Sequence, residues 1–114
     1  MNAINIQKSW ERMINFYSKE NTGRSTRLGV FERERNSITD YWIEDGLELV
    51  GIDIDTKDKN PTIGISVGEM THEVSNVVNL VFRFGISGDE DGIDLVGGDG
   101  RTTILRFEDK SQNV

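Results

Sequence analysis

Leu47-Glu48-Leu49-Val50-Gly51-Ile52-Asp53-Ile54-Asp55 is the stretch that decides the fold. Apolar and polar residues alternate along it, which is the pattern of a β-strand with one buried face. The phase of the alternation changes in the middle, because the two leucines share one parity and the later Val and Ile residues share the other. A β-bulge near Leu49–Gly51 would bring both sets to one face. The stretch therefore predicts a bulged strand in an antiparallel sheet.

The rest of the chain from residue 25 onward repeats this two-residue period. Ile and Val together number 21, against 6 Leu and 1 Ala, and β-branched side chains favour sheets over helices. Turn signals separate the alternating segments, among them the Asp-Gly pair of Glu44-Asp45-Gly46 and the polar turn Lys57–Pro61. The predicted strands are 26–35, 37–43, 47–55, 63–67, a short one within 71–76, 78–84, 92–96 and 102–108.

One helix is predicted, over about residues 9–20. Ser9 is placed to cap it, and an apolar stripe follows at helical spacing, formed by Trp10, Met13, Ile14 and Tyr17. Asn21-Thr22-Gly23 supplies the stop, with Gly23 in the left-handed conformation. We interpret the stripe as the face that covers a sheet.

The expected fold is therefore α+β. One N-terminal helix packs on a curved antiparallel meander sheet, or a small barrel, of about six strands. The 114 residues suit a single domain, with a β body over about 25–108 and a frayed tail over 109–114.

Composition excludes several classes of protein. The chain has no cysteine, which excludes disulfide frameworks, zinc ribbons and thiol catalysis. Its longest apolar runs are three residues, such as Leu80-Val81-Phe82, too short for a membrane span. The first eight residues lack the pattern of a secretory signal, so we expect a cytoplasmic, acidic protein with no membrane partner.

Charge is unevenly distributed along the chain. Residues 1–36 carry seven basic and four acidic side chains, whereas residues 37–114 carry six basic and sixteen acidic ones. The two parts have net charges of +3 and −10, which give the overall −7. This acidic field disfavours nucleic acid. Complementary poles favour a protein partner, or a homo-oligomer formed head-to-tail or about a two-fold axis.

The motifs of common enzymes are missing. His72 is the only histidine, and its parity groups it with Met70 and Val74. A lone histidine in a strand is typical of a half-buried structural residue. The sequence contains no nucleophile elbow, no His-Glu-x-x-His helix, no Walker loop and no dinucleotide-binding glycine pattern. We therefore predict no catalytic residues.

Acidic turns raise the alternative of a calcium site. Five carboxylates occur within eleven residues: Asp89, Glu90, Asp91, Asp94 and Asp99. Calcium takes six to eight oxygen ligands, so such a cluster could bind it weakly. The EF-hand spacing is absent, and the same residue types are common in solvent-facing turns. The leading prediction includes no cofactor, with calcium as the alternative.

A second set of carboxylates raises an enzyme alternative. Asp53 and Asp55 share one strand face, and Asp58 follows in the next turn. Paired carboxylates can act as general acid and base, but only beside a pocket. The competing interpretation is a solvated strand end.

Four stretches together resemble a small bacterial domain family of unknown function. A Trp-bearing helix runs from Ser9-Trp10-Glu11 through Phe16-Tyr17-Ser18 to Asn21-Thr22-Gly23. The strand quoted at the start matches a Leu-x-Gly-Ile-x-x-Asp pattern, and His72-Glu73-Val74 matches a short histidine strand. Asp99-Gly100 leads into Leu105-Arg106-Phe107. The family tends to place proline after the histidine strand, where this chain has Asn76-Val77. The resemblance implies a compact domain and brings no characterised activity.

The leading prediction is a non-enzymatic binding or protein-interaction module that uses exposed strand edges or the acidic turn face. Weak calcium binding is the first alternative, and a carboxylate-based enzyme is the second.

Overall fold

A computed structural model describes residues 3–34, 37–83 and 91–108 of the chain. It contains one helix, α1 (Ala3–Asn21), followed by seven strands. The strands are β1 (Ser25–Glu34), β2 (Ser37–Asp55), β3 (Thr62–Val67), β4 (Met70–Val74), β5 (Val77–Arg83), β6 (Gly92–Gly97) and β7 (Arg101–Phe107). The α+β class is thus confirmed. The expected count of about six strands is slightly low. The predicted segments 37–43 and 47–55 are parts of one strand, β2, and the short strand predicted within 71–76 is β4.

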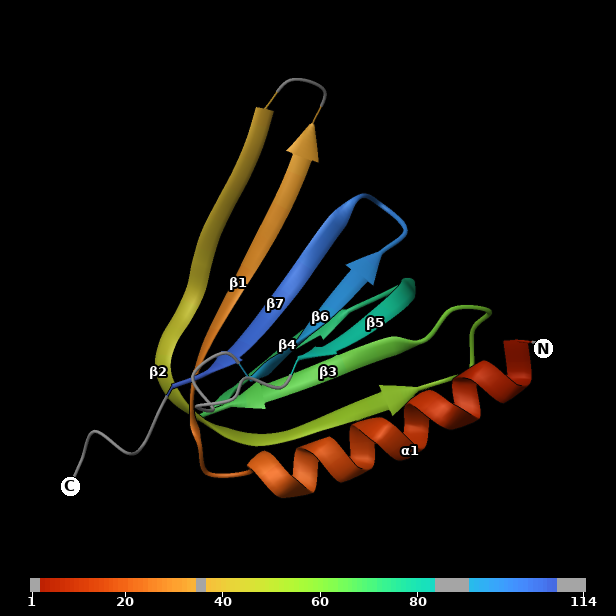
Figure 1. Ribbon diagram of the computed structural model, residues 1–114, viewed down its shortest axis with the longest axis horizontal. Helices are drawn as coiled ribbons and strands as arrows, with labels where there is room; N and C mark the ends of the chain where they lie inside the picture. The colour runs from red at the N-terminus through yellow and green to blue at the C-terminus, as the bar shows by residue number, and fades with distance from the viewer. Residues whose placement is uncertain (1–2, 35–36, 84–90, 109–114) are drawn as a thin grey trace.

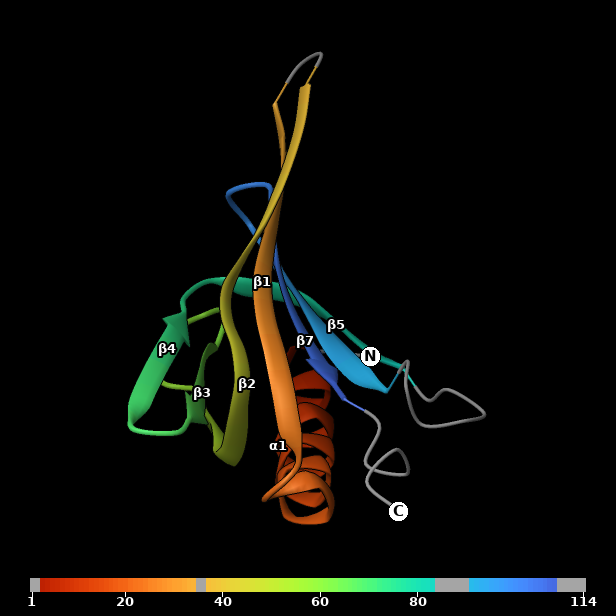
Figure 2. The ribbon, with the colours of Figure 1, turned by 90° about the vertical axis from the view of Figure 1, so that its left-hand side faces the viewer.

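The strands form one curled antiparallel sheet in the order β4-β3-β2-β1-β7-β6-β5. Two meanders, β1–β4 and β5–β7, are joined by the pairing of β1 with β7, which runs from Thr26↔Phe107 to Glu32↔Arg101. The consecutive strands β4 and β5 therefore lie at opposite edges (Figure 2). The simple meander prediction is wrong in this respect, and the sheet is an open half-barrel.

A short crossover links the two edges. Asn76 adopts a positive φ of 55° and its carbonyl accepts the N–H of Gly98 at 3.0 Å. The Asn60 amide donates to the Asn76 side-chain oxygen at 2.7 Å, and the Val77 N–H donates to the Pro61 carbonyl at 3.0 Å. These contacts tie the crossover to the β2–β3 connection and to the β6–β7 turn.

Strand β2 bends because it contains bulges. The register with β3 shifts between Leu49 and Gly51, so Val50 is the extra residue and the predicted bulge is confirmed. The turn predicted at Glu44-Asp45-Gly46 is wrong, since pairing with β1 continues through it. Gly46 has φ 94° and sits at a register shift, so its conformational freedom produces a bulge and not a hairpin.

The helix packs into the concave side of the sheet (Figures 1 and 2). It begins at Ala3, so the predicted start at Ser9 is wrong. No Gly or Pro occurs between residues 3 and 21 to stop it, and Ser9 lies inside the helix. Ile14 and Tyr17 of the predicted stripe are buried and Trp10 packs against the core, whereas Met13 is exposed.

The helix also takes the place of a neighbouring strand beside β2. Ser18 Oγ accepts the backbone N–H of Ile52 at 2.9 Å. On the other side, the Tyr17 ring lies 5.3 Å from that of Phe82 and 5.8 Å from that of Phe107. The helix therefore connects the two halves of the curled sheet and satisfies part of the backbone edge of β2.

No helix in the described part of the chain is long and apolar enough to cross a membrane. The predicted frayed tail, 109–114, lies outside the described residues.

Candidate functional site

Strand β4 forms one edge of the sheet and has a different environment on each face. It pairs with β3 from Val67↔Met70 to Ile63↔Val74 without a register shift. A two-residue turn at Gly68-Glu69 creates this hairpin, with Gly68 at φ 57°. Because side chains alternate along a strand, His72 and Val74 face the concave side and Glu73 faces the convex side.

A pocket of about 240 Å³ lies on the concave side of β4. We call it the inner pocket; it is lined by Val30, Ile43, His72, Glu73, Val74, Ser75, Asp99, Arg101 and Thr103. These residues come from β1, the bulged part of β2, β4 and the crossover after it, the β6–β7 turn and β7. The inner pocket thus exists only because the sheet curls.

Arg101, the basic side chain of the inner pocket, is already paired. Its Nε lies 2.7 Å from Glu32 Oε1, and its backbone N–H donates to Asp99 Oδ1 at 3.0 Å. His72 is half-buried, as predicted. The inner pocket combines apolar side chains with an arginine that already has a partner, and it therefore favours small or neutral groups.

A second pocket, of about 220 Å³, lies on the convex side of the same strand. We call it the outer pocket; it is lined by Asp53, Ile54, Asp55, Thr62, Gly64, Thr71 and Glu73. The register places Asp53, Gly64 and Glu73 in one row across β2, β3 and β4. Gly64 has no side chain and is buried, and the Asp53 carboxylate lies over it, since a Cβ built on Gly64 would be 3.4 Å from Asp53 Oδ2. The row therefore has a carboxylate on each side of Gly64.

The outer pocket has an uncompensated negative charge. Among the described residues, none of its three carboxylates (Asp53, Asp55 and Glu73) forms an ion pair with a basic side chain. Asp55 Oδ1 accepts a backbone N–H, that of Lys57, at 3.0 Å. Like charges on neighbouring strands repel, so a cationic group bound between them would be favoured.

The enzyme hypothesis required a pocket beside Asp53, Asp55 and Asp58. Such a pocket is present over the first two, while Asp58 is not among its lining residues. The hypothesis stays a prediction.

The five carboxylates of the calcium hypothesis are not gathered into one site in the described structure. Asp89 and Glu90 lie outside the described residues. Asp91 precedes β6 and Asp99 follows it, which separates them by about 25 Å at roughly 3.3 Å per residue. Across the described ranges, no group of three or more Asp, Glu or His side chains could hold a metal ion. Calcium binding stays a prediction, without support from the three carboxylates that the structure describes, those of Asp91, Asp94 and Asp99.

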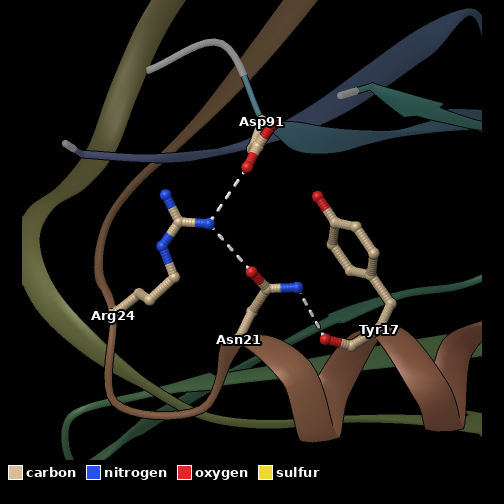
Figure 3. A network of polar contacts seen from close by, with 4 residues as sticks. All are labelled: Tyr17, Asn21, Arg24 and Asp91. Carbon is tan, nitrogen blue, oxygen red and sulfur yellow. Dashed lines mark hydrogen bonds and ion pairs between the residues drawn. The ribbon is translucent and has the colours of Figure 1, made fainter. Parts of the chain in front are cut away.

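Asp91 belongs instead to a network at the end of the helix (Figure 3). Arg24 Nη1 donates to Asn21 Oδ1 at 2.9 Å and lies 3.2 Å from Asp91 Oδ2, while the Asn21 amide donates to the Tyr17 carbonyl at 2.8 Å. Burial, and then the nearby Asp91 charge, raises the pKa of Tyr17 well above its usual range. The network connects α1 and β1 to β6.

Asp94 forms an ion triad with two arginines. Its Oδ2 lies 2.9 Å from Arg83 Nη2, and its Oδ1 lies 2.8 Å from Arg106 Nη1. The carboxylate is buried, with 10% of the side chain exposed. A carboxylate held between two guanidinium groups stabilises the packing of β5, β6 and β7 and is already neutralised.

Sequence reasoning missed Gly64 and Glu73 as site residues. The alternation Ile63, Ile65, Val67 with Gly64, Ser66, Gly68 does predict a small-residue face. What it does not contain is the register of β3 with its two neighbours, and that register puts Gly64 between two carboxylates.

No model of a protein family, no curated protein and no solved structure matches the chain. The resemblance noted above therefore stays an expectation, and function has to be argued from the site itself.

Proposed function

We propose that the protein is a non-enzymatic interaction module that binds an extended segment of a partner protein as an additional strand along the edge of β4. The observation that carries this proposal is that both pockets line the same edge strand, one on each face.

Strand addition uses both the backbone edge of β4 and the two pockets beside it. Every second residue of an edge strand turns its N–H and C=O groups away from the sheet, and a bound segment can pair with them. Side chains of that segment then point alternately to the two faces of the sheet. Backbone hydrogen bonds supply affinity, and the inner and outer pockets would supply specificity.

Two other edges of the sheet are less suited to accept a strand. The later part of β2 is bordered by α1, whose Ser18 hydroxyl binds its backbone. Strand β5 has a bulge at Val78, where its register with β6 shifts. Bulges and covering elements are the usual means by which proteins protect sheet edges. Strand β4 has neither a bulge nor a proline, and Glu73 is the only carboxylate on it.

Selection from a displayed library of random seven-residue peptides tests this proposal. Each enriched peptide is titrated into the ¹⁵N-labelled protein. Strand addition predicts amide shifts in residues 70–74 and slower hydrogen exchange at alternate amides of β4. Enrichment of no peptide, or shifts confined to other elements, would overturn the proposal.

Backbone pairing can be separated from side-chain attraction with N-methylated peptides. Each enriched peptide is resynthesised with N-methyl groups on either its odd or its even residues. Only one edge of an added strand bonds to β4, so one of the two peptides should lose binding and the other should keep it. Equal binding by both would contradict pairing with the β4 backbone.

A further inference from the structure

We propose, on the basis of this strand-addition function, that the edge selects a cationic side chain: a lysine or arginine of the bound segment lies in the outer pocket between Asp53 and Glu73. This names the chemical class of partner that the module recognises.

The geometry of the row supports a long side chain. Strands in a sheet are about 4.8 Å apart, so a residue added opposite Glu73 starts about 9.6 Å from Gly64. A short side chain would end above Glu73, whereas lysine or arginine can extend past Glu73 toward Asp53. The Asp53 carboxylate lies over the buried Gly64, since a Cβ built on Gly64 would be 3.4 Å from Asp53 Oδ2.

Charge complementarity identifies the occupant. The outer pocket has three carboxylates without a basic partner among the described residues, and residues 37–114 have a net charge of −10. A second copy of this chain would bring a second set of the same carboxylates to the same face, where they would repel. An acidic segment would be rejected for the same reason, so a basic segment of another protein remains.

The inner pocket does not share this preference. Its Arg101 is already paired with Glu32 at 2.7 Å. Selection for positive charge is therefore confined to one face of the bound strand. The basic residue of the segment is therefore expected on that face, to which every second side chain points, and neutral residues suit the positions between.

Three acetylated and amidated peptides test this inference: Val-Lys-Val-Lys-Val-Lys-Val and its counterparts with Gln or Glu in place of Lys. Binding to the protein is measured by calorimetry at low salt. We expect the Lys peptide to bind at least tenfold more tightly than the Gln peptide, and the Glu peptide to bind more weakly than either. The preference should disappear in the double variant Asp53→Asn, Glu73→Gln.

Glu69→Gln is the matched control for the single variant Glu73→Gln, because it makes the same charge change on the exposed turn before β4, outside the lining of the outer pocket. The Glu69→Gln variant should keep most of the preference for the Lys peptide over the Gln peptide. Thermal unfolding of all variants checks that the exposed substitutions leave the fold intact. A preference that survives the double variant, or that Glu69→Gln reduces as much as Glu73→Gln does, would refute the role of the outer pocket.

This inference and the proposed function fail in different ways. Equal binding of the Lys and Gln peptides, with shifts in β4, would refute charge selection and leave strand addition supported. Binding of the Lys peptide with no shift or protection in β4 would overturn both.

Discussion

Gly64→Ala should make the protein more stable. Gly64 lies in the interior of β3 and does not have a positive φ, so alanine can adopt its backbone conformation. Glycine within a strand or helix is destabilising by about 0.5–1 kcal/mol relative to alanine, because it loses more conformational freedom on folding. A Cβ at this position would meet Asp53 Oδ2 at 3.4 Å and Thr71 Cγ2 at 3.8 Å, which are ordinary contacts.

The expected gain is therefore about 0.5–1 kcal/mol in the free energy of unfolding. For a domain of this size it corresponds to a rise in melting temperature of about 2–4 °C. Urea unfolding followed by far-ultraviolet circular dichroism measures the change, with an unaltered slope against urea showing that the compactness of both states is unchanged. A less stable variant would show that the space over Gly64 is needed for folding.

Gly92→Ala is the matched control, since Gly92 is also a strand glycine. A Cβ there would collide with the Leu105 carbonyl oxygen and would lie 2.8 Å from Arg106 Nη1. Overpacking of this kind costs about 1–3 kcal/mol. Changes of opposite sign in the free energy of unfolding of the two variants would support the argument, and equal destabilisation would refute it. If Gly64→Ala also weakens binding of the lysine peptide, the absence of a side chain at Gly64 serves binding at a cost in stability.

Three further substitutions test the framework around the site by urea unfolding. Asp94→Asn should lower the free energy of unfolding by about 2–3 kcal/mol, because it leaves Arg106 without its buried counter-charge. A loss below about 1 kcal/mol would refute a stabilising triad. Ser18→Ala should lose about 1–3 kcal/mol by leaving the Ile52 N–H unsatisfied beside the helix; an unchanged midpoint would show that water replaces the hydroxyl. Above about pH 10 tyrosine ionises in the unfolded chain, whereas burial raises the pKa of Tyr17 in the folded one, so stability should fall with rising pH. Tyr17→Phe should flatten this decline, and an unchanged slope would contradict the assignment.

Local patterns in the sequence predict local structure well. The change of phase between Leu49 and Ile52 predicts a bulge. A strand can keep the apolar residues before and after the change on one buried face only by adding a residue. Asp45-Gly46 was misread for an equally physical reason. A tight hairpin turn and a glycine bulge can both use a glycine at positive φ, and only the long-range pairing of β2 with β1 decides between them.

The candidate site depends on non-local register, which a two-residue period does not encode. The sequence does predict that Asp53 and Asp55 share a face and that β3 has a small-residue face. It does not reveal that Gly64 lies between Asp53 and Glu73, because that requires the pairing of three strands. The edge position of β4 likewise follows from the pairing of β1 with β7, whose partners lie 69 to 81 residues apart in the sequence.

The length of β4 also predicts how tightly a basic extended segment would bind to its edge. Five residues span about 17 Å, so an added strand buries less surface than the roughly 1,600 Å² of a standard interface, and the complex should be weak and short-lived. The chain's net charge of −7 would speed the approach of a basic segment. Because the screening length falls from about 10 Å at 0.1 M salt to about 3 Å at 1 M, added salt should slow association of the Lys peptide. The Gln peptide should be little affected, and an equal slowing of both peptides would show that electrostatic attraction does not guide the encounter.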